Sequence, residues 1–278
     1  MKRSDISVLI LTHNSYATKA GAVEFVINAY LNQTVKPHQI IVINNGSDAQ
    51  NTAKLQEFCD GLPDVRIISC NLTIGGARNF GVKFVESRYI LFNDDDTIPM
   101  QNDCIERLIA YCNQDAIYGY GANRLWSPDL NWVSKNRTAL LKITKSGDLT
   151  ELKKDAIVPA PEIRYKNQNS VKILLKSFIG NFGIIAKTDF YAIGGFPEYP
   201  GYSCEDDAFA FLCYLRLGKP VVFDNIELLH ISHPLTETAP AEISNNQKLL
   251  QKLLSDNGYK AFHISRLLFG GDGVLELL

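Results

Sequence analysis

The chain has 278 residues, of which 46% are hydrophobic and 21% charged, and its formal net charge is −2. This composition supplies apolar material for one large core or two modest ones, and the near-neutral charge argues against a nucleic-acid-binding protein. No stretch reaches the roughly 18 apolar residues of a membrane span, and the apolar run near the amino terminus is too short for a signal peptide. The six cysteines have neither CxxC pairs nor zinc-ligand spacing, which favours reduced thiols and a cytoplasmic protein.

The first hundred residues alternate predicted strands with predicted helices. Apolar runs predict buried strands at 6–12, on both faces, and at 39–45, and further strands at 65–70 and 89–93. Helical spacing of apolar residues and a capped turn predict helices at 20–33, within 46–60 and at 75–87. This order predicts an α/β fold with a mainly parallel sheet, flanking helices and right-handed crossovers.

The periodic pattern weakens after residue 100. Residues 121–170 show no clear helix, and the alternation in 140–152 predicts a hairpin. Further elements are predicted as a strand, short helix and Gly-Gly-Phe-Pro turn in 177–198, a helix at 204–219, strands at 220–224 and 227–234, and helices at 241–256 and 258–269. No repeat, low-complexity tract or linker interrupts the chain, so residues 1–278 are expected to form one domain.

Three of the predicted strands end in polar clusters. Ligands bind along the carboxyl edge of open α/β sheets, so we expect these clusters to lie close together although they are distant in the sequence. The clusters are Thr12, His13 and Asn14 after the first strand, Asn44 and Asn45 after the second, and Asp94, Asp95 and Asp96 after the fourth.

The three consecutive aspartates repel one another, by about 4 kcal/mol for a pair 4 Å apart near a protein surface. Two interpretations are open at this point. The aspartates form a solvated acidic turn, or a divalent cation offsets their repulsion at the ligand edge. An EF-hand is excluded, because the sixth loop position is not glycine.

Two further groups of residues could carry chemistry. Glu205, Asp206 and Asp207 open a predicted helix, where acids stabilise the helix dipole, but one of them could also serve as a general base. His230 and His233 are either structural or metal ligands. Aspartate oxygen with imidazole nitrogen suits Mn²⁺ or another borderline divalent ion.

Taken in order, these motifs resemble the family 2 glycosyltransferases of the GT-A fold across roughly residues 5 to 235. "SVLILTHN" resembles the first strand of that family, "IIVINNGSDAQNT" its second strand and turn, and "GGARNFGVKF" its Ala-Arg-Asn-x-Gly helix. "NDDD" resembles the DXD motif, and "GGFPE" followed by "EDDAF" resembles the acceptor-side motifs. "HISH" is similar to the metal-binding segment of the β-1,4-galactosyltransferases.

The resemblance implies a Rossmann-like nucleotide-binding sheet with a small antiparallel part on the acceptor side. It implies a nucleotide-sugar half over about 1–100, an acceptor half over about 101–235 and a helical tail over about 236–278. The implied activity is metal-dependent, inverting transfer of a hexose or N-acetylhexosamine from a nucleoside-diphosphate sugar, with a UDP-sugar favoured. The implied acceptor is a hydroxyl of a glycan or lipid-linked glycan, in cell-surface polysaccharide or lipooligosaccharide assembly.

The resemblance also implies a role for each matching residue. Asp206 is expected to be the base that deprotonates the acceptor hydroxyl. The expected ligands of Mn²⁺, or of Mg²⁺, are Asp96, His233 and His230. Asp94 and Asp95 are expected to face the ribose and the donor sugar. All residues expected to contact the nucleotide sugar are Thr12, Asn14, Asn45, Arg78, Asp94, Asp95 and Glu205.

The chain departs from the family pattern in the turn after the second strand. Asn44 and Asn45 stand where an aspartate is usual, so the charge is lost, although the amide of Asn45 can still pair with a uracil edge. Thr73 also replaces a glycine that is often found there.

Two alternative functions remain open from the sequence. One is a haloacid-dehalogenase-type phosphatase, because "LFNDDDTI" superficially resembles its nucleophile strand. Ile98 stands where that motif needs Thr or Val, and this strand is the fourth instead of the first. The other is a non-catalytic sugar-nucleotide-binding module, which the presence of Asp206 and both histidines disfavours.

The tail "AFHISRLLFGGDGVLELL" is rich in Leu and Phe but broken by glycines. It is expected to pack over the sheet or at a dimer contact. The alternative is peripheral docking at the inner face of the plasma membrane, near a lipid-linked acceptor.

Overall fold

The fold is taken from a computed structural model of the chain. The residues that the structure describes are 3–112, 117–118, 124–147, 158–159, 173–175, 182–201, 203–218, 221–222, 226–233, 240–262 and 273–277. The elements up to residue 112 are β1 (Ile6–Thr12), α1 (Ser15–Thr18), α2 (Ala22–Leu31), β2 (Gln39–Asn45), α3 (Ala49–Cys59), β3 (Val65–Cys70), α4 (Ile74–Val82), β4 (Tyr89–Asp94), β5 (Thr97–Pro99) and α5 (Cys104–Cys112).

The second part of the chain has shorter strands and longer connections. Its elements are β6 (Ile117–Tyr118), β7 (Arg124–Trp126), α6 (Leu130–Lys135), α7 (Arg137–Ser146), β8 (Val158–Pro159), β9 (Ile173–Leu175), β10 (Phe182–Ala186), α8 (Lys187–Ile193), α9 (Glu205–Leu217), β11 (Val221–Val222), β12 (Leu228–His230), α10 (Pro240–Asp256), β13 (Tyr259–Phe262) and β14 (Gly273–Leu277).

Within the described residues, seven strands form the main sheet in the order β11-β6-β10-β4-β1-β2-β3. The pairs β4–β1, β1–β2 and β2–β3 are parallel, whereas β10 runs antiparallel to β4. Two smaller sheets, β5-β12-β7-β8 and β13-β14-β9, contain mostly antiparallel pairs. The expected α/β fold, with a mainly parallel sheet and a small antiparallel part, is therefore confirmed.

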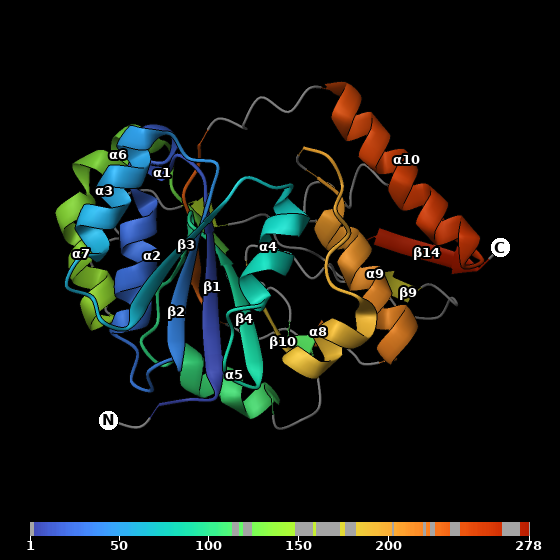
Figure 1. The fold of residues 1–278 in the computed structure, drawn as a ribbon, viewed down its shortest axis with the longest axis horizontal. Coiled ribbons are helices and arrows are strands. Elements are labelled where there is room, and N and C mark those ends of the chain that lie inside the picture. The colour runs from blue at the N-terminus through green and yellow to red at the C-terminus, as the bar shows by residue number, and fades with distance from the viewer. Residues whose placement is uncertain are drawn as a thin grey trace.

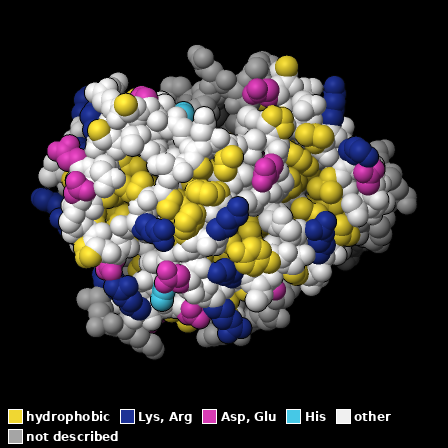
Figure 2. Space-filling view, viewed as in Figure 1, with side chains coloured by type: hydrophobic (Ala, Val, Ile, Leu, Met, Phe, Trp, Pro, Cys, Tyr) yellow, Lys and Arg dark blue, Asp and Glu magenta, His cyan; other side chains and the backbone are white. Residues whose placement is uncertain are grey.

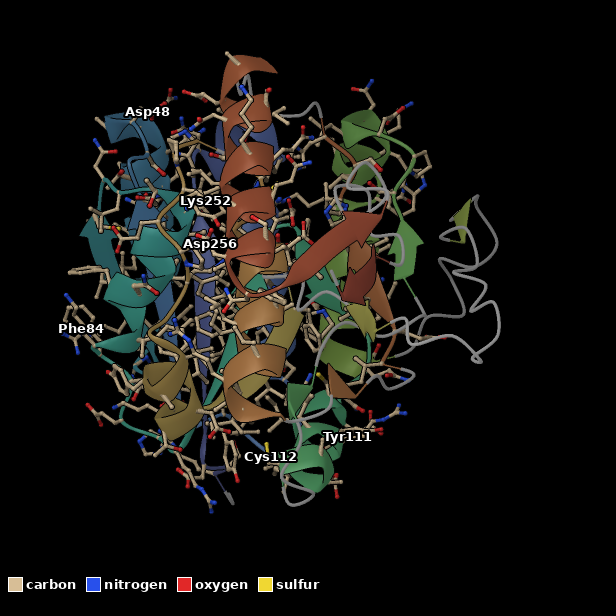
Figure 3. All side chains as sticks on the ribbon, turned by 90° about the vertical axis from the view of Figure 1, so that its right-hand side faces the viewer. Asp48, Phe84, Tyr111, Cys112, Lys252 and Asp256 are labelled. Carbon is tan, nitrogen blue, oxygen red and sulfur yellow. The ribbon has the colours of Figure 1, made fainter. Side chains whose placement is uncertain are left out.

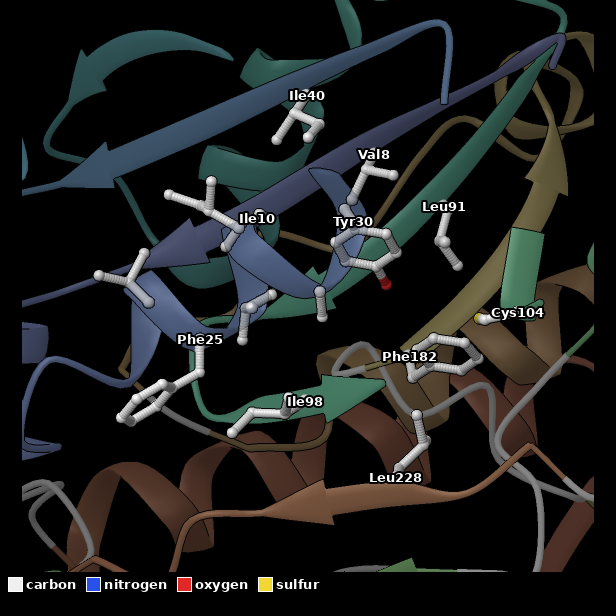
Figure 4. Packing of buried hydrophobic residues seen from close by; sticks show 14 of the residues in the cluster. Val8, Ile10, Phe25, Tyr30, Ile40, Leu91, Ile98, Cys104, Phe182 and Leu228 are labelled. Carbon is white, nitrogen blue, oxygen red and sulfur yellow. The ribbon is translucent and has the colours of Figure 1, made fainter. Parts of the chain in front are cut away.

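Helices cover both faces of the main sheet, with α2, α3, α6 and α7 on one side and α4, α8 and α9 on the other (Figure 1). Alternate residues of each strand enter opposite layers, as the period of two in a strand requires. Val8 packs with α2 in one hydrophobic cluster, whereas Leu9 packs with α4 in the other. Figure 4 shows the first of these layers, in which Val8, Leu91 and Tyr30 lie together.

The predicted hairpin at 140–152 is wrong for its first arm, because Arg137–Ser146 forms α7. Leu140 and Ile143 are buried and Ser146 ends the helix before Gly147, which has φ 71°. Helical spacing of the buried residues, and packing against α2, therefore outweigh the local alternation. Residues 148–152 lie outside the described residues. The helices α5 and α6 had no counterpart in the sequence prediction, which found no clear helix in residues 121–170.

The tail begins with α10, as predicted, but the segment after α10 differs from the predicted second helix. Leu250 and Leu254 are buried, and α10 packs alongside α9, which Figure 3 shows with Lys252 and Asp256 labelled on α10. A second helix was predicted from residue 258, but Tyr259–Phe262 is strand β13, paired with β14. The rest of that prediction, and the segment to residue 272, lies outside the described residues, so the dimer and membrane alternatives for the tail stay predictions.

No helix among the described residues is long and apolar enough to cross a membrane. On the face drawn in Figure 2, Lys and Arg side chains are interspersed with Asp and Glu, and apolar patches lie between them. All six cysteines are free thiols. Burial raises the pKa of Cys59 to about 11 and that of Cys112 to about 12, so these thiols are protonated at neutral pH.

Candidate active site

The ends of β1 and β4 meet, because the two strands are parallel neighbours with Leu11 opposite Asp94. The hydroxyl of Thr12 donates a 2.6 Å hydrogen bond to Oδ2 of Asp95, and the amide of Asp95 donates to the carbonyl of Leu11 at 3.1 Å. Thr12 and Asp95 are both buried, so Thr12 fixes the carboxylate from beneath the edge of the sheet.

The loops after β1 and β2 are also joined. His13 Nδ1 lies 2.8 Å from the carbonyl oxygen of Asn45, and Asn14 Oδ1 accepts from the amide of Asp48 at 2.9 Å. Asn14 has φ 49°, a left-handed conformation that asparagine tolerates better than most residues. The side chain of Asn45 bonds both the amide and the carbonyl of Leu72, at 2.9 and 3.0 Å, so this asparagine also holds the loop after β3 in place.

The three aspartates lie in different surroundings. Asp95 is completely buried, Asp96 is 5% exposed and the Asp94 side chain is 26% exposed. The ammonium of Lys19 lies 2.5 Å from Oδ1 of Asp95 and 3.3 Å from Oδ2 of Asp96. The cluster is therefore not a solvated acidic turn, and its repulsion is offset in part by a lysine of this chain.

Arg78 is the second cation among these carboxylates. Its guanidinium donates to Asp94 Oδ1 at 3.1 Å and to Glu205 Oε1 at 3.0 Å, and its side chain is 5% exposed. Burial would lower the pKa of Arg78, but Asp94 and Glu205 raise it, so the guanidinium stays protonated. Arg78 thus joins the acidic end of β4 to the first residue of α9.

Electrostatics separate Asp94 from Asp96. Burial raises the pKa of Asp94 above its usual value, although Arg78 opposes this. Burial would also raise the pKa of Asp96, but Lys19, His230 and the hydrogen-bonded His233 hold it well below its usual range. Asp96 therefore stays an anion over the whole neutral range.

The acids of α9 are also unequal. Glu205 and Asp207 are buried, whereas Asp206 is partly exposed and its Oδ1 accepts the amide of Asp207 at 3.0 Å. Burial, with Asp206 and Glu205 as neighbours, raises the pKa of Asp207 well above its usual value. Of these three acids, Asp206 is the one with both access to solvent and a position at the start of a helix.

Asn79, which the sequence analysis gave only as part of the Ala-Arg-Asn-x-Gly motif, connects the two halves of the site. Its side chain accepts from the amide of Phe196 at 2.8 Å and donates to the carbonyl of Phe196 at 2.9 Å. A Cβ at Gly75 would lie 2.2 Å from the carbonyl oxygen of Pro197, so this glycine permits the close approach of α4 to the Gly-Gly-Phe-Pro turn. Arg78 lies over the ring of Phe196, 5.1 Å from its centroid.

The segment that leads into α9 has an unusual backbone. Ser203 has φ 111° and Cys204 has φ 68°, although neither is glycine. Asn246 of α10 is completely buried and donates to the carbonyl oxygens of Pro200, at 2.7 Å, and Ser203, at 3.2 Å. The tail helix therefore holds the strained turn that places Glu205 and Asp206.

Asp96 lies against the two histidines of β12 and its following residues. His233 Nε2 is 2.9 Å from Asp96 Oδ2, and His230 Nε2 is 3.6 Å from Oδ1. The strand ends at His230, and the amide of Ile231 donates to the Asp96 carbonyl at 2.8 Å. Residues 231–233 lie beyond the strand and are not bound to its alternation, so both rings reach one carboxylate.

Across the described ranges, no group of three or more His, Cys, Asp or Glu side chains is arranged as a metal-binding cluster. The distances around Asp96 are those of hydrogen bonds and ion pairs, and Lys19 shares its Oδ2 with His233. One carboxylate and two imidazoles nevertheless form a donor set that suits a borderline divalent ion. We conclude that the residue types fit a metal, which would need small shifts of the rings and of Lys19.

The predicted site residues thus fall into two linked groups. The first group surrounds Lys19 and contains Thr12, Asp95, Asp96, His230 and His233. The second group surrounds Arg78 and contains Asp94 and Glu205, with Asp206 at the next position of α9. Asn14 and Asn45 lie in the adjoining loops. The sequence analysis missed Lys19 and Asn246, and it gave Asn79 only as part of the Ala-Arg-Asn-x-Gly motif, because each contact joins residues 43 or more positions apart.

Comparison with known proteins gives a family assignment. The family model described as "Glycosyl transferase family 2" matches residues 7–180. The O-antigen chain rhamnosyltransferase RfbN of Salmonella typhimurium is 24% identical over 232 residues, which are 83% of this chain and 67% of that protein.

Solved structures are similar in fold. S. aureus TarS 1-349, solved in complex with UDP-GlcNAc, has a TM-score of 0.60 at 16% identity, over 91% of this chain and 66% of that chain. The mannosyltransferase PcManGT from Pyrobaculum calidifontis, solved with GDP-Man and Mn²⁺, has a TM-score of 0.57 at 12% identity, over 92% of this chain and 65% of that one. At such low identity these similarities show the fold alone, and this chain spans just under two thirds of either structure.

Proposed function

The chain belongs to glycosyl transferase family 2 and is therefore a transferase, and we propose that it moves a sugar from a nucleoside diphosphate to a glycan hydroxyl. The observation that carries the proposal is the Arg78 bridge, which joins the aspartates after β4 to the acids that open α9. A phosphatase of the haloacid-dehalogenase type does not fit the family match. One relative, the O-antigen chain rhamnosyltransferase RfbN, supports a cell-surface polysaccharide or lipooligosaccharide as the product.

In the proposed reaction, Asp206 accepts the proton of an acceptor hydroxyl. The hydroxyl oxygen attacks the anomeric carbon, and the bond from that carbon to the diphosphate oxygen breaks. A single displacement with one base inverts the configuration of the anomeric carbon. The partial exposure of Asp206 and its place at the start of α9 suit this role, because the acceptor must approach from solvent.

Asp96, His230 and His233 would hold a divalent cation, for which Mn²⁺ is our first choice. Bound there, the ion supplies a Lewis acid that neutralises the diphosphate leaving group. Asp94, on the exposed side of the cluster, is proposed to contact the ribose or the donor sugar. Asp95 is better placed to hold Lys19 and Thr12, since it is buried beneath the other two.

The nucleotide loops are proposed to be built from Thr12, Asn14 and Asn45. Both ends of the Asn45 side-chain amide bond the backbone of Leu72, which leaves the second N–H of that amide to donate to a base edge. A UDP-sugar remains our first choice of donor. Related structures hold UDP-GlcNAc and GDP-Man, and one relative is a rhamnosyltransferase, so we add a deoxyhexose such as rhamnose to the proposed hexose and N-acetylhexosamine donors.

A donor screen tests this function. We expect one nucleotide sugar among UDP-Glc, UDP-Gal, UDP-GlcNAc, UDP-GalNAc, GDP-Man and dTDP-rhamnose to raise the melting temperature by about 5 °C at saturating concentration, because a ligand that binds only the folded state stabilises it. The shift should require Mn²⁺, and the same donor should release its nucleoside diphosphate slowly by hydrolysis. A shift that is the same with EDTA would contradict the metal, and no shift with any donor would contradict the transferase site.

Asn246→Ala is expected to lower kcat by about 10- to 100-fold, because the loop that places Asp206 loses two hydrogen bonds, and small misplacements of catalytic groups are costly. Donor affinity should change less than about twofold, since Asn246 is bonded to the loop that leads into α9. Steady-state kinetics and donor isotherms give both values. Asn257→Ala, which removes an exposed hydrogen bond at the end of α10, is the control. Equal loss of donor affinity and kcat would show a general loss of structure instead.

A further inference from the structure

Lys19 is a cation that contacts the carboxylate proposed to bind the metal. Its ammonium contacts Asp95 Oδ1 at 2.5 Å and Asp96 Oδ2 at 3.3 Å, and its side chain is 14% exposed. The same oxygen of Asp96 lies 2.9 Å from His233 Nε2. One carboxylate oxygen is therefore shared by a fixed positive charge and by a proposed metal ligand.

The backbone around Lys19 holds it in place. The amide of Lys19 donates to the carbonyl of Ser15, and its carbonyl accepts from Ala22, which closes the turn between α1 and α2. Ala20 has φ 52° and Gly21 has φ 71°, so two successive residues are left-handed, one of them not glycine. Such a conformation persists only when its surroundings impose it. The turn therefore directs Lys19 at the aspartates instead of leaving it on the surface.

Charge balance shows why the lysine matters. The carboxylates that Lys19 and Arg78 contact are Asp94, Asp95, Asp96 and Glu205, so four negative charges face two positive ones and leave −2 when the histidines are neutral. Without Lys19 the same group would carry −3, so the lysine weakens the attraction of the site for a divalent cation. The diphosphate of a donor carries negative charge with which Lys19 can pair in place of Asp96.

We propose that Lys19 is an internal competitor of the divalent cation, occupying Asp95 and Asp96 until metal and donor arrive together. The inference rests on the metal site of the proposed function and goes beyond it by naming a residue that sets when the metal binds. Metal alone must displace Lys19 from Asp96 and is therefore bound weakly. When the donor diphosphate is present, Lys19 pairs with its negative charge, and Asp96 is left to the metal.

The test compares Mn²⁺ affinity in the absence of nucleotide, measured from the electron paramagnetic resonance signal of free Mn²⁺. Lys19→Gln is expected to bind Mn²⁺ at least about 10-fold more tightly than the unaltered chain, because a competing charge is gone. Lys19→Arg, which keeps the charge, should stay weak. Lys83→Gln removes an exposed lysine at the end of α4 and is the control.

A second measurement guards against poor folding of the variant. Lys19→Gln leaves Asp95 buried without its cation, so its melting temperature should fall, and Mn²⁺ should restore more of it than in the unaltered chain. Lys19→Met, which keeps the apolar stem, is measured in the same way if the glutamine variant is insoluble. The enhancement of Mn²⁺ affinity by UDP should also be smaller in both variants.

The outcomes separate the two hypotheses. Equal or weaker Mn²⁺ affinity in both uncharged variants, with measurable binding to the unaltered chain, would overturn the role of Lys19 and leave the metal site intact. Absence of Mn²⁺ binding in every variant, with and without UDP, would overturn the metal site and the role of Lys19 with it.

Discussion

Asp206→Asn is expected to lower kcat by about 10²–10⁴ while donor affinity stays nearly constant, because positioned general-base catalysis contributes an acceleration of that size. Asparagine keeps the shape of the side chain, and its carbonyl oxygen can still accept the amide of Asp207. What it loses is the ability to take a proton from the acceptor. Initial rates of transfer and a donor-binding isotherm give the two values.

A control distinguishes a base from an acid that only stabilises a helix. Asp189 also lies in the first turn of a helix, α8, so Asp189→Asn makes the same chemical change in a similar backbone position. We expect Asp189→Asn to change kcat less than about twofold, since the interaction of an acid with a helix dipole is small. If Asp206→Asn loses donor affinity, or retains kcat, Asp206 is not the base.

Asp96→Ala is expected to abolish Mn²⁺-dependent donor binding, lowering donor affinity by more than about 100-fold at a fixed Mn²⁺ concentration, because even groups that only orient a metal ligand are worth 10- to 100-fold. The chain should stay folded, since Lys19 keeps its contact with Asp95. Calorimetry with the donor across a Mn²⁺ series measures the loss. Unchanged Mn²⁺-dependent affinity in this variant would falsify the assignment of Asp96 as a ligand.

The histidines provide a graded comparison for the same experiment. His233→Ala should weaken donor binding and recover in part at raised Mn²⁺, because Asp96 and His230 remain as ligands. His233 is closer to Asp96 than His230 is, at 2.9 Å against 3.6 Å, so its loss should be the larger of the two. His38→Ala is the control, since His38 pairs with Glu86 next to the start of β1. Full activity of His233→Ala at low Mn²⁺ would show that this ring is structural.

The first hundred residues could be predicted well from the sequence, because β1, β2 and β4 are buried on both faces and contain apolar runs. The edge strand β3 is only partly buried, but its position between two helices in the alternating pattern still identified it. The convergence of Thr12 with Asp95 followed from the rule that parallel strands end at one edge of a sheet. The errors fall elsewhere. α7 was read as a hairpin and β13 as a helix, since their local patterns were weak and tertiary packing decided the outcome.

The ion pairs of Lys19 and Arg78 could not be predicted, because residues that pair across 76 or 127 positions leave no local sequence pattern. Arg78 was expected at the site through the family resemblance, but its two carboxylate partners were not. Thr73 was noted only as a departure from glycine, and the structure gives it a purpose: its hydroxyl caps α4 by accepting from the amide of Gly76.

Arg78 comes from one half of the chain but holds an acid of the other, which restricts how such halves can be recombined. Suppose that a chimera took its acceptor-binding segment from a relative with a neutral residue in place of Glu205. The buried guanidinium would then keep only Asp94, and breaking a buried ion pair costs about 3–5 kcal/mol. We therefore expect a chimera to fold only when the relative that supplies the acceptor-binding segment has an acid at the position of Glu205. New acceptor preferences should evolve more readily in the loops around α9 than by replacement of the helix itself.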